Sequence, residues 1–470
     1  MADSQQKKDI PVSGPSSRSQ PWKEFLLNVL GAAILMFFAL YDNYPILNSD
    51  SGAYISSGFS LQPPIDRPLF YGLFIRLSSL GVSLWISVFF QCFILAYLLK
   101  QFIRKSIPIA TGLHIVGIFV FVSMFTIGGW FASQVMPDIF VSILILSLVN
   151  FFLFPNTRRD RIYLLGISFI AVLTHNSNFI ILTLFIVIIF GLSFFIDSFK
   201  VYRAKLIPAS VLCVAAWTTL CTVNWLGGLG FTTSRSTHVF VMGKLVESGV
   251  LKTYLDKACP IKNYKICKYI DSLPPVAWQF HWDGSSPLQK EGGWDANREE
   301  YNTIIRDIFS RPKYYPYMAF KAVEATARQL AGTNIDGWYI LPWNKFDEES
   351  SPYKAILEHF PHEISEVKIS RQNTKTLYIG FFDNLFLIVI TTSIFLVLLL
   401  LPRTQYNEFF RVFSLVLILM VLNAFATAVL SSVNERFNSR VVWLIPFVNI
   451  IFLVKAVRYH FFFKIGEGIE

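Results

Sequence analysis

Apolar residues along this chain gather into uncharged runs instead of spreading evenly. Most runs are about 17 to 25 residues long, which is what a helix rising about 1.5 Å per residue needs to cross roughly 30 Å of hydrocarbon. The pattern predicts an all-α polytopic membrane protein with about ten transmembrane helices. The fifth of the ten ranges is the shortest, and in order they are residues 25–42, 82–100, 108–128, 138–154, 162–175, 178–196, 206–225, 378–401, 411–431 and 441–457.

The amino-acid composition also indicates a membrane protein. Of 470 residues, 53% are hydrophobic and 15% are charged, which lies outside the range expected of a soluble globular chain. The first run lacks a small-residue cleavage site, so we expect it to remain as a span and not to be removed as a signal peptide.

Basic residues indicate the orientation, because Lys and Arg near span ends are retained on the cytoplasmic side. They occupy the connections before the first span and after the second, fourth, sixth, eighth and tenth. Both termini are therefore predicted to be cytoplasmic, and we expect a bacterial inner membrane. This topology explains most of the net charge of +10, so we predict no nucleic-acid partner.

The expected organisation follows from these assignments. Function is expected in the segments outside the membrane, above all in the first external loop, residues 43–81. The predicted parts are a disordered cytoplasmic tail (1–22), a transmembrane module containing that loop (23–225), a mixed or mostly helical periplasmic domain (226–377), C-terminal transmembrane helices (378–457) and a second cytoplasmic tail (458–470).

Two of the five cysteines, Cys259 and Cys267, fall in the predicted external domain. Cysteines on an oxidising face favour a disulfide, which here would close a short loop. No nearby His cluster completes a four-ligand metal site. The other three cysteines lie in apolar runs, where a small buried side chain is the ordinary role.

The first external loop places Asp50 just beyond the end of span one, where membrane and water meet. A carboxylate at that depth can accept a proton from an acceptor hydroxyl, or hold a divalent cation against a phosphate. The alternative is that Asp50 only caps a helix beginning near Ser51.

The loop resembles the polyprenyl-phosphate-dependent glycosyltransferases of the GT-C superfamily. Asp50 and Tyr54 match the acidic part of the family pattern, and the segment Arg67-Pro68-Leu69-Phe70-Tyr71 matches its Pro- and aromatic-rich part. The resemblance implies a GT-C-like fold, Asp50 as catalytic base, and Tyr54, Arg67 and Tyr71 as substrate-binding residues. This loop has Asn48-Ser49-Asp50-Ser51 where many members have paired acids, so a divalent cation stays an open alternative, with Asp66 as a candidate second carboxylate.

A second match lies before the last span, where family members often carry an external arginine. Arg436 and Arg440 precede a helix containing Pro446, and their guanidinium groups suit a phosphate clamp. The alternative is two interfacial arginines that snorkel or pair with Glu435.

Four further residues are candidates for binding phosphate or sugar on the same face. Asp138 could instead begin its helix by ordinary N-terminal chemistry, and His175 could belong to a polar turn between spans. Arg235 and His238, close after span seven, would also suit an exposed loop.

The external domain adds aromatic and amphipathic segments. Residues 278–284 and 292–295 combine Trp with Asp, which suits sugar rings but equally suits a domain core or a membrane interface. Apolar spacing predicts an amphipathic helix from about residue 297 and a second one to about residue 330, beside the membrane surface.

The sequence thus predicts inverting sugar transfer from a polyprenyl-phosphate-linked donor to a lipid, glycan or protein acceptor. Its expected partners are that donor and membrane lipids. An O-antigen-type polymerase or ligase is the alternative if Arg235 and Arg436 matter while Asp50 does not. A lipid or glycan transporter is the third interpretation, although the spans are poor in charge at mid-membrane.

Overall fold

The computed structural model describes residues 21–334, 346–400 and 407–466. All regular elements in these ranges are helices, with one isolated bridge between Ile46 and Gln134. The predicted tail, residues 1–22, lies outside the described residues except for its last two, where α1 begins. The prediction of an all-helical chain is confirmed for the described part.

The N-terminal half alternates long helices with short ones. Each predicted apolar run up to residue 225 coincides with a helix or with a pair of helices, because an uninterrupted apolar run can satisfy its backbone in lipid only as a helix. The elements are α1 (Pro21–Leu35), α2 (Phe37–Asp42), α3 (Ser51–Ser60), α4 (Phe70–Ser78), α5 (Leu84–Ser106), α6 (Gly112–Phe125), α7 (Gly128–Ala132), α8 (Ile139–Leu153), α9 (Arg158–Thr174), α10 (Asn176–Phe195), α11 (Asp197–Lys200) and α12 (Arg203–Leu226).

The remaining elements form the long segment between α12 and the C-terminal helices, followed by those helices. In order they are α13 (Thr237–Glu247), α14 (Val250–Ala258), η1 (Lys265–Tyr269), α15 (Ala277–Trp282), α16 (Pro287–Lys290), α17 (Gly293–Ala296), α18 (Arg298–Phe309), η2 (Pro312–Tyr314), α19 (Tyr315–Ala331), α21 (Ser351–His359), η4 (Pro361–Glu363), α22 (Ile364–Ile369), α23 (Ile379–Leu400), α24 (Asn407–Leu430), α25 (Glu435–Val442) and α26 (Leu444–Gly466). Helices α18 and α19 confirm the two predicted amphipathic helices.

Six stretches of the described chain are long and apolar enough to cross a membrane, which marks the protein as an integral membrane protein. The other predicted spans are helical but shorter: α6 has 14 residues and α8 has 15, and the first run is divided at Met36 between α1 and α2. The six stretches are Leu84–Ser106, Asn176–Phe195, Arg203–Leu226, Ile379–Leu399, Glu408–Leu430 and Glu435–Val457.

Helix α8 lies at the centre of the bundle, since 14 of its 15 residues are buried. It packs against α5, α9, α24 and α25. A helix that is apolar on all sides and covered by neighbours does not need to match the bilayer thickness by itself. Its burial therefore explains why an uncharged run this short remains a stable helix.

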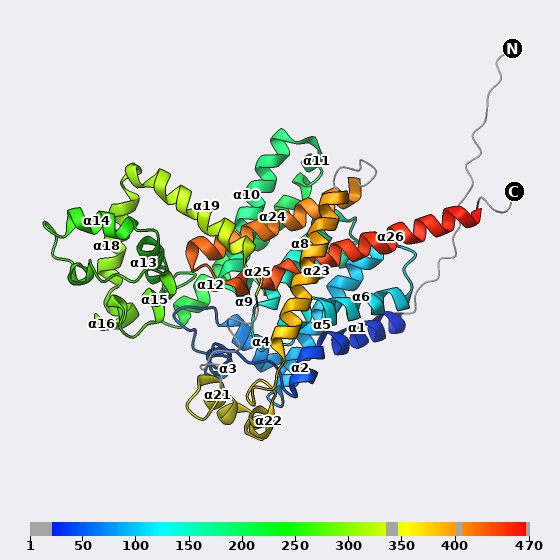
Figure 1. The fold of residues 1–470 in the computed structure, drawn as a ribbon, viewed down its shortest axis with the longest axis horizontal. Helices are drawn as coiled ribbons and strands as arrows, with labels where there is room; N and C mark the ends of the chain where they lie inside the picture. The colour runs from blue at the N-terminus through cyan, green and yellow to red at the C-terminus, as the bar shows by residue number, and fades with distance from the viewer. Residues whose placement is uncertain (1–20, 335–345, 401–406, 467–470) are drawn as a thin grey trace, which may run out of the picture.

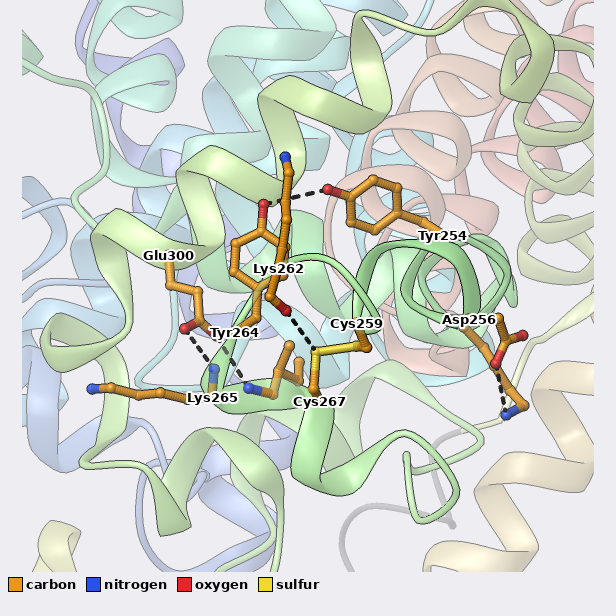
Figure 2. Close-up of a disulfide and its surroundings, with 10 residues drawn as sticks. Tyr254, Asp256, Cys259, Lys262, Tyr264, Lys265, Cys267 and Glu300 are labelled. Atoms are coloured by element: carbon orange, nitrogen blue, oxygen red, sulfur yellow. Dashed lines mark hydrogen bonds and ion pairs between the residues drawn. A yellow bond between two sulfur atoms is a disulfide. The ribbon is translucent and has the colours of Figure 1, made fainter.

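Residues 237–314, which we call the lobe, have a hydrophobic core of their own that runs from Val239 to Tyr314. Figure 1 shows α13 to α18 gathered at one end of the molecule, opposite the start of α1 and the end of α26. The predicted Cys259–Cys267 disulfide is present in the lobe and closes the loop between these two cysteines (Figure 2). Glu300 accepts hydrogen bonds from the backbone N–H groups of Lys265 and Ile266 within that loop.

The part of the long segment after residue 346 packs on the first external loop, away from the lobe. Helix α21 contacts α3, and α22 follows α21 at the same end of the molecule in Figure 1. The buried Glu363 accepts hydrogen bonds from the Tyr44 hydroxyl and from the Leu84 backbone N–H. Gln372 bonds both backbone groups of Leu47. The segment after residue 346 and the first external loop are therefore held together by these hydrogen bonds.

Candidate functional site

The first external loop is held at the start of α8 by backbone pairing. Ile46 accepts a hydrogen bond from the N–H of Val135 at 2.9 Å and donates one to the carbonyl of Ser133 at 3.0 Å. The hydroxyl of Ser51 donates to the carbonyl of Val135 at 2.9 Å. These bonds place the beginning of α3 beside the beginning of α8, so Asp50 and Asp138 become neighbours.

Helices α3 and α4 approach each other closely through two glycines. A Cβ atom on Gly72 would lie 2.6 Å from the backbone nitrogen of Gly58 and 2.6 Å from the carbonyl oxygen of Tyr54. No other residue type fits such a backbone contact without displacement. This contact sets the position of the turn before α4, which carries Arg67, against α3.

Asp50 does not cap the helix that follows it. It occupies the N-cap position of α3, but its side chain accepts no capping hydrogen bond. Next to it, the Asn48 side chain accepts from the Asp50 N–H at 3.2 Å and the Ser51 hydroxyl accepts from the Asn48 N–H at 2.9 Å. The capping explanation of Asp50 is therefore wrong, and its carboxylate is available for other contacts.

Six charged side chains form a continuous chain of ion pairs that begins in the first loop and ends in α25. The pairs run from Asp66 to Arg67 (2.7 Å), Arg67 to Asp50 (3.1 Å), Asp50 to Arg436 (4.0 Å), Arg436 to Asp138 (3.3 Å) and Asp138 to Arg440 (3.2 Å). Three carboxylates alternate with three guanidinium groups, so the formal charge of the set is zero. This balance is what allows so many charges to be withdrawn from water together.

Exposure decreases along this chain of ion pairs from Asp50 to Arg440. The Asp50 side chain is 37% exposed, that of Arg436 is 10% exposed, and those of Asp138 and Arg440 are fully buried. Asp50 is thus the accessible end of this stretch and Arg440 the buried end. Asp50 can therefore contact a substrate directly, whereas Arg440 cannot do so without a rearrangement.

Arg440 is fixed by contacts from three other helices and one turn. Besides Asp138, its guanidinium donates to Asn423 Oδ1 at 2.8 Å and to Ser177 Oγ at 3.2 Å, and its Nη1 lies 3.3 Å from His175 Nε2. At the N-cap position of α8, where the alternative role at a helix start places it, Asp138 makes no side-chain capping bond, and its carboxylate pairs with the two arginines instead. Its second oxygen, Oδ2, has no hydrogen-bond partner within the described part of the chain.

Two tyrosines border the accessible end. The Arg67 guanidinium lies over the Tyr54 ring, 5.1 Å from its centroid, and Tyr54 meets Tyr71 edge to face at 5.2 Å. The Tyr71 hydroxyl donates to Gln91 Oε1 at 3.1 Å, and the Gln91 amide in turn donates to the carbonyls of Ala132 and Gln134. The aromatic wall is therefore tied to the same α7–α8 connection that holds Asp50.

The electrostatics favour an ionised Asp50. Burial opposes its charge, but Arg67 and then Arg436 outweigh this effect and hold the pKa of the carboxyl below its usual range. For Arg67, burial acts to lower the pKa, whereas Asp50 and its other anionic neighbours raise the pKa well above the usual value. Both groups are consequently charged at neutral pH.

Eight of the ten predicted catalytic and substrate-binding residues come together in this cluster, although they come from segments far apart in the sequence. Arg235 and His238 lie elsewhere: Arg235, just before the lobe, pairs with Asp295 of the lobe at 2.9 Å, and His238 Nε2 is 2.8 Å from the carbonyl oxygen of Trp294. The eight gathered residues are Asp50, Tyr54, Arg67, Tyr71, Asp138, His175, Arg436 and Arg440.

Sequence reasoning did not assign Gln91 and Asn423 to the site. Both are fully buried amides in otherwise apolar helices, and a polar residue inside an apolar run is the available signal. Among the described residues, no group of three or more His, Cys, Asp or Glu side chains is arranged to hold a metal ion.

Comparisons of this chain with protein-family models, with curated proteins and with solved structures found no match.

Proposed function

We propose that this protein is an integral membrane glycosyltransferase of the GT-C type. It takes a sugar from a polyprenyl-phosphate-linked donor and transfers it to a hydroxyl of a lipid, glycan or protein acceptor. The observation that carries the proposal is the pairing of Asp50 with both Arg67 and Arg436. It joins the two segments on which the family resemblance rests, although they lie at opposite ends of the chain.

Asp50 serves as general base in the proposed reaction. The acceptor oxygen attacks the anomeric carbon of the donor sugar, the bond from that carbon to the phosphate oxygen breaks, and the leaving phosphate keeps the electron pair. Asp50 takes the proton of the acceptor hydroxyl, which requires an ionised and accessible carboxylate. Its ion pairs support the first condition, and its 37% exposure supports the second.

Arg67 and Arg436 stabilise the phosphate. Guanidinium groups bind phosphate oxygens in a fixed, two-pronged geometry, and stabilising the charge that develops on a leaving group is a large part of such catalysis. When the donor phosphate shares these arginines, they stabilise the charge on Asp50 less, and the proton affinity of that carboxylate rises. Donor binding therefore prepares the base.

The proposed topology has ten spans with both termini in the cytoplasm of a bacterial inner membrane. The shorter helices α6, α8 and α9 belong to the bundle in this scheme, and the first span is the pair α1 and α2. Alternating basic connections support the arrangement. Asp50, Arg67 and Arg436 then face the periplasm.

Binding of polyprenyl phosphate tests the proposal and separates it from the polymerase alternative. Arg67→Ala and Arg436→Ala are expected to weaken binding by about tenfold or more, because each removes a charge-assisted hydrogen bond of about 1.5–3 kcal/mol. Arg235→Ala is the matched control and should bind normally. Loss of binding in Arg235→Ala and Arg436→Ala together with normal activity in Asp50→Asn would favour the polymerase alternative.

A further inference from the structure

Helix α19 has one apolar face that the protein itself leaves uncovered. Phe320 is 62% exposed and Val323 is 69% exposed, whereas Ala325 and Gln329 on the opposite side are buried. With 3.6 residues per turn, Pro316, Phe320 and Val323 lie on the same side of the helix as Ala327. An isolated exposed apolar residue is ordinary, but a stripe of this kind along a helix indicates a contact surface.

The exposed face of α24 indicates what covers this stripe. Phe410, Leu417 and Val421 lie on one side of α24 and are between 37% and 57% exposed. Since α24 is apolar and long enough to span a membrane, this side contacts lipid. The stripe from Phe410 to Val421 therefore faces the hydrocarbon, and Val421 marks the level at which the hydrocarbon ends.

Beyond Val421 this side of α24 is covered, although Leu430 at the end of the helix is 38% exposed. The residues from Leu422 to Ala424 and from Ala426 to Ala428 are buried, α19 packs against α24, and Figure 1 shows the two helices crossing at this end. Gln329 exchanges hydrogen bonds with the backbone of Asn434, just after α24 ends. At this level α19 takes the place of α24 as the outer surface.

We propose that the apolar face of α19 lies in the interface of the lipid bilayer and anchors the lobe to the membrane. The side chains suit that environment. Tyr315 and Tyr317 at its N-terminal end are aromatic residues of the kind that settle at the headgroup level. Lys321 and Arg328 lie along one edge of the stripe, where both pair with Glu324, and their stems can contact apolar atoms while their charged ends stay at the headgroups.

The anchor reaches the ion-pair cluster directly. The last turn of α19 is bonded to Asn434, which caps α25 by accepting from the Arg436 N–H, and the Asn438 side chain donates to the carbonyls of Leu330 and Gly332. Helix α25 carries Arg436 and Arg440. A helix seated in the bilayer thus sets the depth at which these arginines stand.

Site-directed fluorescence in proteoliposomes tests the proposal. The full chain carrying Phe320→Cys or Val323→Cys is labelled with an environment-sensitive maleimide dye and exposed either to lipids carrying a nitroxide on the acyl chain or to a water-soluble nickel quencher. The matched control is Ile261→Cys on the lobe, where the native side chain is 85% exposed. The unsubstituted protein, whose free cysteines lie in α5 and α12, supplies the labelling background.

Labels at positions 320 and 323 are expected to be quenched by the lipid nitroxide and protected from nickel, and the label at position 261 is expected to show the reverse. Quenching of all three by nickel would overturn the proposal. Protection of positions 320 and 323 from both quenchers would also overturn it, because protein, such as a second copy of the chain, would then cover this face.

Discussion

Arg440 and Asp138 form an ion pair between two fully buried side chains, with 3.2 Å between Nη1 and Oδ1. The pair joins α25 to the beginning of α8, and Arg436 continues it toward Asp50. A buried pair whose arginine also donates hydrogen bonds to Asn423 and Ser177 contributes to a fixed geometry more surely than to net stability. We infer that the Arg440–Asp138 pair holds Arg436 and Asp50, at the accessible end of the cluster, in position.

Removing one partner of this pair should be costly. Asp138→Asn leaves two guanidinium groups, those of Arg436 and Arg440, without their shared carboxylate. We expect a loss of about 3–5 kcal/mol in the free energy of unfolding, measured by denaturant titration in detergent. Asp295→Asn is the control, because it breaks an exposed pair with Arg235 and should cost less than about 1 kcal/mol. Equal losses in the two variants would show that the buried pair is not structural.

Stability should depend on pH through Asp50. Arg67 and Arg436 lower the pKa of this carboxyl in the folded state. The ionised form of Asp50 is therefore more stable in the folded protein than in the unfolded chain. Its stabilising contribution is complete above the unfolded value of about 3.9 and is lost as the pH falls through the lower folded value. Wild type should therefore be more stable than Asp50→Asn near neutrality. The difference should shrink in acid, and a difference that grew in acid would contradict this account.

The bond between α19 and α25 can be tested through Gln329. Gln329→Leu removes two hydrogen bonds to Asn434, so α25 should lose its register and the affinity for polyprenyl phosphate should fall about tenfold, equivalent to about 1.4 kcal/mol. Thr326→Val on the same helix is the control, because that hydroxyl bonds only a carbonyl of its own helix, Ala322. Unchanged affinity in Gln329→Leu would show that α19 does not contribute to phosphate binding.

The glycine contact between α3 and α4 supplies a fourth prediction. Gly72→Ala puts a methyl group where the backbones of Gly58 and Tyr54 lie 2.6 Å away, so the helices must separate and Arg67 must move relative to Asp50. We expect a lower Tm and weaker phosphate binding. Gly166→Ala in α9 meets no atom within 4 Å and should leave Tm unchanged or raise it. Similar Tm values for the two variants would show that the close approach is not required.

The sequence was sufficient where structure depends on local pattern. Apolar runs located the long helices, and the spacing of aliphatic residues located α18 and α19, because the periodicity of a helix is written in neighbouring residues. The number of helices able to span a membrane was harder to predict from the sequence. A run shows how many apolar residues are present, but not whether the helix is interrupted, as at Met36, or buried by neighbours, as α8 is.

Contacts between distant segments were beyond the sequence. Asp50 was weighed against a local capping role, and the structure shows that its carboxylate pairs with Arg67 and Arg436 instead. Arg235 was expected near the site because it follows a span. It pairs instead with Asp295, which lies 60 residues further along the chain. One sequence carries no information on which of its charges will pair once the helices have packed.

The transfer reaction itself provides the most direct measurement. Turnover of wild type, Asp50→Asn and Asp271→Asn should be compared in proteoliposomes with a panel of polyprenyl-phosphate-linked sugars, with donor binding measured in parallel. We expect Asp50→Asn still to bind the donor but to lose about 100-fold or more in turnover, while Asp271→Asn, altered at an exposed lobe carboxylate, keeps the wild-type rate. Full turnover by a correctly folded Asp50→Asn variant would contradict the assignment of Asp50 as the base.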